Sequence, residues 1–194
     1  SGLFKLEDKV VAQLANSLGY QLIKAEAEKA ALAKSPDVLD LTMRGWALAW
    51  RTRQMPLQKD CKAALELFDR ALAIDPNEAS ALAGEAAIRF VQYSFGWGGD
   101  GVDYDAEILV KADRAIAIAP ENTQAYLVKS EYLSASGRAR NGLEVANAGL
   151  VISPNDAHLL AARGFAEIAL GQFEQAKKDF EPALLLSPRD LAVA

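Results

Sequence analysis

The sequence predicts an all-α fold of stacked helical hairpins. Pro120, Pro154 and Pro188 are 34 residues apart, and Pro76 precedes Pro120 by 44 residues. Each proline ends a similar apolar phrase, such as Arg70-Ala-Leu-Ala-Ile-Asp-Pro76. A period of about 34 residues is the length of one helix–turn–helix repeat. Because such units bury their apolar faces against their neighbours, we expect the function to lie in the surface that the stack presents.

The composition fits this fold and excludes several partners. The chain has 194 residues, of which 51% are hydrophobic, enough for one domain or one short solenoid. A net charge of −5 without a dense basic patch argues against nucleic acid. Neither a secretory signal nor an apolar run of about 18 residues is found, so we expect a cytoplasmic chain without a membrane partner. The single cysteine, Cys61, falls on an apolar helix position and is expected to be buried.

Residues 1–37 are predicted to form an N-terminal helical cap or a degenerate repeat. Ala30-Ala-Leu-Ala-Lys-Ser-Pro36 copies the closing phrase, and Gly19 falls on the turn position. One helical stripe contains Leu6, Val10, Leu14 and Leu18. Lys24 and Glu28 stand where small and aromatic residues belong, so one long helix remains an alternative to a hairpin. Since the chain already opens on helix-like residues, we expect it to be a piece of a longer protein.

The repeats 38–76 and 79–120 carry extra residues. In the first repeat, the slots for small and aromatic contact residues are filled by Gly45, Ala64, Phe68 and Ala71. The insertions lie near 51–56 and near 96–105. We expect both at the turn inside a hairpin, where added length is tolerated.

The repeats 123–154 and 157–188 keep the 34-residue length. The second matches best, in seven slots: Gly164, Gly171, Phe173, Ala176, Phe180, Ala183 and Pro188. These residue types at this spacing resemble the tetratricopeptide (TPR) pattern. The predicted architecture is therefore a right-handed TPR superhelix of four hairpins with an N-terminal helical cap.

Parts of the chain resemble one bacterial group more closely, namely the C-terminal TPR regions of class III adenylate cyclases and of related winged-helix regulators. The segments that carry the resemblance are Leu41-Thr-Met-Arg-Gly45-Trp-Ala-Leu, Ala64-Leu-Glu-Leu-Phe-Asp-Arg-Ala-Leu-Ala-Ile-Asp-Pro76, Tyr93-Ser-Phe-Gly-Trp97 and the leading Leu3-Phe-Lys-Leu-Glu-Asp-Lys. The resemblance implies a regulatory region whose catalytic or DNA-binding domain lies upstream. None of these segments carries cyclase chemistry.

No residue pattern in the chain supports catalysis, a cofactor or a metal. The glycine-rich segment 96–101 lacks the Gly-Lys-Ser/Thr ending of a phosphate loop. Asp100, Asp103 and Asp105 do not have the spacing of a calcium loop. His158 is the only histidine, too few for a zinc site, and we expect it to be solvated. We therefore predict no catalytic residues, no cofactor and no metal ligands.

The first helix of each TPR hairpin lines the concave side of the stack. In this chain the inward positions are apolar or small, where carboxylate-clamping TPR proteins place Lys, Arg and Asn. The predicted partner-binding groove consists of Trp46, Trp50, Phe90, Leu127 and Phe165. Since an exposed apolar patch usually marks a partner site, we expect a protein or peptide there, with a homodimer as one possibility. The competing interpretation is that these side chains only pack helix against helix.

The predicted function is protein–protein interaction or self-association. The resemblance places it in the regulatory region of a bacterial cyclase or signalling regulator. A TPR assembly factor of a secretion or envelope system is the alternative. A hidden enzyme is a third class, but no set of acid, base and nucleophile supports it.

Overall fold

The computed structural model describes residues 37–188, so the predicted cap, residues 1–37, lies outside the described residues except for Asp37. The described part of the chain contains only helices and no strand, which confirms the all-α prediction. In order, the helices are α2 (Val38–Gln54), α3 (Gln58–Ile74), α4 (Ala79–Ser94), the π-helix η1 (Asp105–Val110), α5 (Lys111–Ile118), α6 (Thr123–Ala135), α7 (Ala139–Ile152), α8 (Ala157–Ala169) and α9 (Phe173–Leu186).

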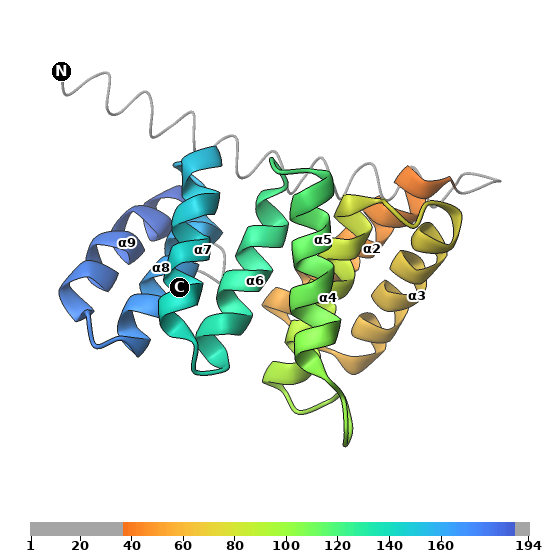
Figure 1. The fold of residues 1–194 in the computed structure, drawn as a ribbon, viewed down its shortest axis with the longest axis horizontal. Coiled ribbons are helices and arrows are strands. Elements are labelled where there is room, and N and C mark those ends of the chain that lie inside the picture. Colours follow the sequence, from red (N-terminus) through yellow and green to blue (C-terminus); the bar gives the residue numbers. More distant parts are fainter. Residues whose placement is uncertain (1–36, 189–194) are drawn as a thin grey trace.

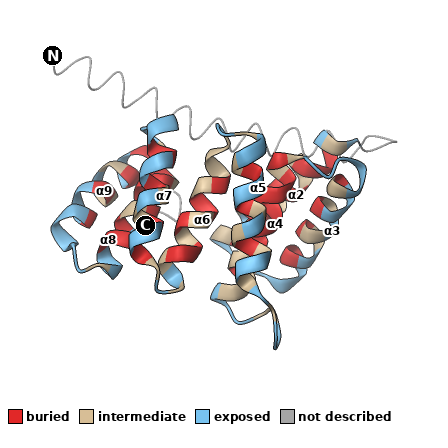
Figure 2. Cartoon of the chain, viewed as in Figure 1, coloured by how far each residue is buried: buried red, intermediate tan, exposed pale blue. Residues whose placement is uncertain are grey.

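The helices form four hairpins that follow one another along the molecule (Figure 1). Each hairpin pairs a first helix (α2, α4, α6 or α8) with a second helix (α3, η1 and α5, α7 or α9). Successive first helices pack on one another, α2 on α4, α4 on α6 and α6 on α8. Buried residues lie on the helix faces turned toward neighbouring helices (Figure 2). The core is therefore continuous from hairpin to hairpin.

A side-chain cap begins every first helix. The carboxylate of Asp37 accepts a hydrogen bond from the backbone N of Asp40 at 2.9 Å, and the other caps are Glu78, Asn122 and Asp156. Each cap lies one or two residues after a repeat proline, Pro36, Pro76, Pro120 or Pro154. Among the second helices, α3, α7 and α9 begin without a side-chain cap, whereas Asp103 Oδ1 accepts from the backbone N of Ala106 at 3.1 Å where η1 begins. The repeated proline phrase thus ends one hairpin and places the cap of the next.

Close packing occurs where the sequence places small residues. A Cβ added at Gly45 or Gly84 would lie 2.5 or 2.3 Å from the ring of Phe68, so both glycines admit that ring between α2 and α4. Ala71 and Ala176 are buried at the expected contact slots. The prediction for Cys61 is also confirmed, because its thiol is buried beside Asp60 and burial raises its pKa.

The two insertions take different forms. Residues 51–54 continue α2 rather than widening a turn, so the expectation of an insertion confined to the turn is wrong here. The second insertion follows α4 as an irregular segment and ends in η1, with Gly96, Gly99 and Gly101 at positive φ. Such conformations favour glycine, and the π-helix turn then passes directly into α5.

Candidate protein-binding surface

Trp46 and Leu127 of the predicted groove lie inside the protein. The indole Nε1 of Trp46 donates hydrogen bonds to the carbonyl oxygen of Ser80 at 3.1 Å and to its Oγ at 2.9 Å. The indole also meets the ring of Phe68 edge-on at 5.9 Å. Trp46 is 6% exposed and Leu127 2% exposed. These two side chains stabilise the joint between helices and offer no surface to a partner. For both residues, packing of helix against helix is therefore the correct interpretation.

Trp50 is half-buried and lies one turn along α2 from Trp46. Its ring centroid is 6.1 Å from that of Trp46 and 4.8 Å from that of His158 on α8. The guanidinium of Arg53 lies over the indole, 5.7 Å from its centroid. Trp50 is thus the groove residue that lies between a polar side chain of its own helix, Arg53, and one from a distant repeat, His158.

Arg53 and Glu131 join the first hairpin to the third. The guanidinium Nη1 and Nη2 donate to the two carboxylate oxygens of Glu131 at 3.0 and 2.6 Å. We define the inner face as Trp50, Arg53, Gln124, Glu131 and His158. Its members come from α2, α6 and α8, which are far apart in the sequence.

The inner face corrects two expectations. His158 is not simply solvated, because its ring lies against Trp50 and its side chain is 13% exposed. Arg53 brings a basic group to a surface that was expected to be apolar or small. Arg53 was not among the predicted groove residues, because the four-residue extension of α2 that carries it matches no TPR slot.

Phe90 and Phe165 lie apart from the inner face. Phe90 is half-buried and stacks on Tyr93 with 6.5 Å between ring centroids, in a cluster beside the second insertion. Phe165 is 51% exposed and meets Phe180 edge-on at 5.1 Å, at the end of the stack formed by α8 and α9. The structure therefore does not bring the five predicted residues together in one groove.

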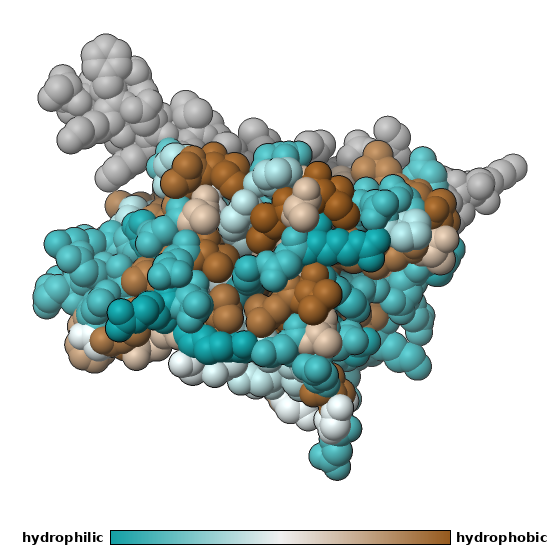
Figure 3. All heavy atoms as spheres, in the orientation of Figure 1, coloured by the Kyte–Doolittle hydropathy of each residue, from teal (hydrophilic) through white to brown (hydrophobic). Residues whose placement is uncertain are grey.

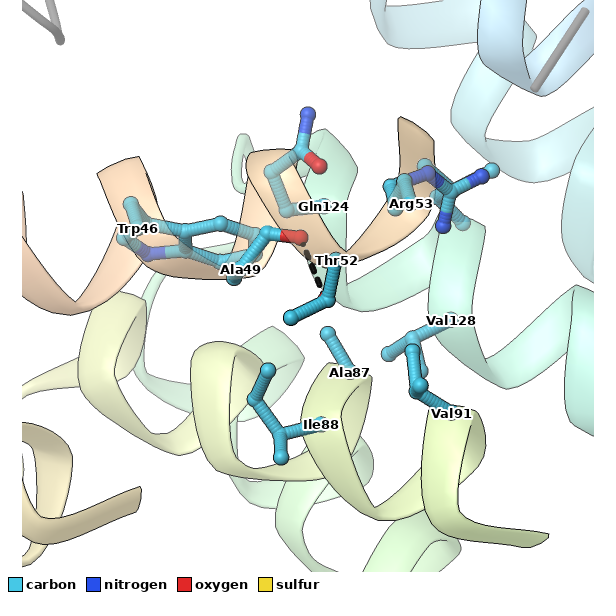
Figure 4. Close-up of a pocket in the computed structure, with 10 residues that line it drawn as sticks. Trp46, Ala49, Thr52, Arg53, Ala87, Ile88, Val91, Gln124 and Val128 are labelled. Carbon is cyan, nitrogen blue, oxygen red and sulfur yellow. Dashed lines mark hydrogen bonds between the residues drawn. The ribbon is translucent and has the colours of Figure 1, made fainter. Parts of the chain in front are cut away.

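A small cavity lies behind the inner face, between α2, α4 and α6 (Figure 4). Its volume is about 10 Å³, which is roughly the space that one water needs. Its walls combine apolar side chains such as Val91 and Val128 with Thr52, whose Oγ1 donates to the carbonyl of Ala49 at 2.7 Å. The cavity has no room for a substrate or a side chain of a partner.

The strongest local electrostatics surround Glu85 on α4, which is 4% exposed. Burial raises the pKa of its carboxyl to about 7, and a hydrogen bond that the protonated carboxyl donates to the side chain of Asp69 acts in the same direction. Lys111 opposes the shift, with Nζ 2.8 Å from Glu85 Oε2 and 3.0 Å from Glu107 Oε2. These groups join α3, α4, η1 and α5, and Glu107 Oε2 also pairs with Arg89 Nε of α4 at 3.2 Å.

A second polar cluster ties η1 to α6 and α7. Arg138 donates two hydrogen bonds of 2.7 Å to the carboxylate of Asp105, and this holds the pKa of that carboxyl below its usual range. The hydroxyl of Tyr132 donates to Asp105 at 2.7 Å, while burial and Asp105 raise the pKa of Tyr132 to about 12. The cluster is satisfied internally and fixes the second insertion against the next repeat.

Neither cluster resembles a metal centre. Within residues 37–188, no three His, Cys, Asp or Glu side chains are grouped in a way that would hold a metal ion. Among the helices of the same region, none has both the length and the apolar character needed to cross a bilayer.

Comparisons with known proteins identify the fold. No family model and no curated protein sequence matches the chain. Among solved structures, a thermophilic TPR protein of Thermus thermophilus matches with a TM-score of 0.66 and 14% identity, covering 94% of this chain and 91% of that one. MamA from MSR-1 matches with a TM-score of 0.53 and 17% identity, covering 93% of this chain and 98% of that one. These likenesses confirm that the chain adopts the TPR superhelix predicted from its proline period.

Proposed function

We propose that this chain is a non-enzymatic protein-interaction module and that its inner face binds a segment of a partner protein. The observation that carries the proposal is the meeting of Trp50, Arg53, Glu131 and His158 from three separate hairpins. Tryptophan and arginine dominate the energy of many protein interfaces. A surface assembled from several repeats also matches the way in which repeat proteins form extended binding surfaces.

The chemistry of the inner face favours a segment that carries a carboxylate beside an apolar or aromatic side chain. The Arg53 guanidinium already holds a carboxylate in two-point contact, and a partner's carboxylate could exchange with that of Glu131. The Trp50 indole would pack against the neighbouring apolar side chain. On the face of the molecule in Figure 3, apolar residues form separate patches among hydrophilic ones.

We further propose that the module is the regulatory region of a bacterial class III adenylate cyclase or a related signalling regulator. The support is the resemblance of the second insertion, where the rings of Phe95 and Trp97 stack at 4.9 Å and Trp97 packs on the core of the first hairpins. A gene whose upstream reading frame encodes a catalytic or winged-helix domain is the expected finding. A secretion signal or lipidation site there would instead favour the envelope assembly factor.

Selection from a random peptide library tests the inner face directly. Peptides are selected on the 194-residue chain and then measured against Trp50→Glu and Arg53→Ala by fluorescence polarisation. We expect the selected peptides to contain Asp or Glu next to an apolar residue, and to bind each variant about tenfold more weakly or worse.

Val151→Glu is the matched control, because Val151 is an exposed apolar residue on a second helix, α7. It should leave peptide affinity unchanged, and circular dichroism should show equal helicity for all variants. Peptides that bind the Trp50 and Arg53 variants as well as the parent chain would overturn the proposed site.

A further inference from the structure

The tip of the second insertion is held at both of its ends. The backbone N of Trp97 donates to the carbonyl oxygen of Gln92 at 2.8 Å, and Trp97 packs on the core of the first hairpins. The Tyr104 hydroxyl lies so close to Gly98 that a Cβ added there would be 1.8 Å from it. Between these two anchors, residues 99–101 are exposed, and the segment projects beyond the end of α4 (Figure 1). The tip itself is therefore open to solvent.

Asp100 and Gly101 at this tip form the only Asp-Gly pair of the sequence. Gly99 and Gly101 have φ of +79° and +80°, and a Cβ added at either position would meet no atom within 4 Å. The backbone N of Gly101 makes no hydrogen bond within residues 37–188. Nothing in this part of the chain therefore hinders the approach of that nitrogen to the carboxyl group of Asp100.

An Asp-Gly pair in such surroundings can react with itself. The backbone N of Gly101 attacks Cγ of Asp100, a bond between N and Cγ forms, and the carboxyl hydroxyl leaves with the amide proton as water. The product is a five-membered succinimide, which solvent water reopens. Cleavage of the bond between this nitrogen and Cγ restores aspartate. Cleavage of the bond to the main-chain carbonyl carbon gives isoaspartate, in which the chain runs through Cγ and the free carboxylate is on Cα.

A second pair, Asn141-Gly142, undergoes the same ring closure with loss of ammonia and reacts faster than Asp-Gly in an unfolded peptide. In the folded chain it lies inside α7, where the backbone N of Gly142 donates to the carbonyl oxygen of Arg138 at 3.1 Å. Gly142 is also buried, and a Cβ added there would lie 2.3 Å from Ser134 Oγ. Ring closure at Asn141 therefore requires local unfolding of α7, whereas ring closure at Asp100 does not.

We propose that Asp100 is a modification site, at which the folded chain forms a succinimide with Gly101 and then isoaspartate. The change lengthens the main chain by one carbon and moves the carboxylate at the tip. Because Trp97 and Tyr104 fix the two ends, the added length stays in the tip and the repeats keep their packing. The converted chain is a substrate for protein isoaspartate methyltransferases, which methylate the free Cα carboxylate. This site is separate from the inner face and does not depend on its proposed function.

Ageing of the folded 194-residue chain in neutral buffer, followed by trypsin digestion and mass spectrometry, tests the proposal. Trypsin cuts after Arg89, Lys111 and Arg140 and so places the two pairs on different peptides. Electron-transfer fragmentation distinguishes isoaspartate from aspartate. We expect isoaspartate to form at Asp100 at least about tenfold faster than at Asn141. In urea, the rate at Asn141 should rise about tenfold or more because α7 unfolds, and the rate at Asp100 should change less than about threefold.

Gly99 and Gly101 offer matched variants, because both have positive φ and equally open surroundings. Gly101→Ala places a methyl group beside the attacking nitrogen and should slow conversion of Asp100 about tenfold or more. Gly99→Ala keeps the Asp-Gly pair, and its rate should stay within about threefold of that of the parent chain. Asp100→Glu would have to close a six-membered ring, so its aged chain should accept no methyl group from an isoaspartate methyltransferase at this position.

Two results would overturn the proposal. One is conversion at Asp100 that is no faster than at Asn141 in the folded chain. The other is an equal rate in Gly101→Ala and Gly99→Ala, which would show that the Asp-Gly pair is not the reacting group.

Discussion

Phe68 is the side chain around which the first two hairpins are assembled. Its ring is fully buried between Gly45 on α2 and Gly84 on α4. In an exposed helix, replacing glycine by alanine would favour folding by up to about 1 kcal/mol. At Gly84 the new methyl group would lie 2.3 Å from the Phe68 Cζ, in a core without space for the ring to move. Packing should therefore outweigh helix propensity.

We predict that Gly84→Ala lowers the free energy of unfolding by about 1–3 kcal/mol, measured by urea denaturation. The smaller side chain in Phe68→Leu makes room for the methyl group, so the double variant should lose less than the sum of the two single changes. Strict additivity would show that the clash is relieved elsewhere.

Glu85 makes stability depend on pH near neutrality. Its carboxyl has a pKa of about 7 in the folded chain, above the ordinary value of 4.5. Between these values the folded state holds a proton that the unfolded state releases. The stabilisation is complete below about pH 4.5 and is lost as the pH rises through 7.

We therefore predict that Glu85→Gln becomes more stable relative to the parent chain as the pH rises from about 5 to about 8, by roughly 1–3 kcal/mol. Thermal melts of both proteins at a series of pH values measure this difference in stability. Other titrating groups are the same in both proteins, so their contributions cancel. Glu144→Gln, an exposed substitution on α7, serves as the control and should show no such trend. A constant difference between Glu85→Gln and the parent would contradict the raised pKa.

At the scale of the element, the capping residues decide where first helices begin. Asp156 is the strongest example, because its Oδ1 accepts from the backbone N of His158 at 2.9 Å and of Leu159 at 3.1 Å. We predict that Asp156→Ala costs about 1 kcal/mol of unfolding free energy in urea denaturation. Asp156→Asn keeps the acceptor oxygen and should cost much less. Equal losses in the two variants would mean that charge, rather than the cap, stabilises α8.

The sequence was sufficient for the helices but not for the insertions. Prolines, capping residues and glycines repeat at fixed spacing, and each has a local physical reason for its place. The continuation of α2 through residues 51–54 and the π-helix η1 have no such local signal. Their conformations depend on contacts with other repeats, such as those of Arg53 with Glu131 and Asp105 with Arg138.

At the scale of the whole molecule, Arg53 and Glu131 tie the first hairpin to the third. Their side chains are 15% and 14% exposed, so water weakens the pair less than it would at the surface. We predict a coupling energy of about 1 kcal/mol or more in a double-mutant cycle of Arg53→Ala and Glu131→Ala. In such a cycle the energies of the other contacts that each residue makes cancel, so that only the energy of the pair remains. A value near zero would show that the tie contributes nothing to stability.

The inner face could not be predicted from the sequence for a related reason. A repeat pattern fixes which residues point inward within one hairpin, as it did for Trp50. The repeat pattern does not fix the curvature of the stack. This curvature brings the ring centroid of Trp50 to 4.8 Å from that of His158, three hairpins later. The curvature is the sum of small rotations between successive hairpins. The contacts of Trp46 with Ser80 and of Phe68 with Gly84 set the rotation between the first two hairpins.

The contact of Trp50 with His158 also restricts how a gene of this kind can evolve. Repeat arrays usually lengthen or shorten by duplication or deletion of whole units, because each unit contacts only its neighbours. Here an added or lost unit between α2 and α8 would turn and displace α8, and the rings of Trp50 and His158 would no longer meet. A lineage that retains this pair is thereby held to its present number of units, and point substitution remains its main route to change.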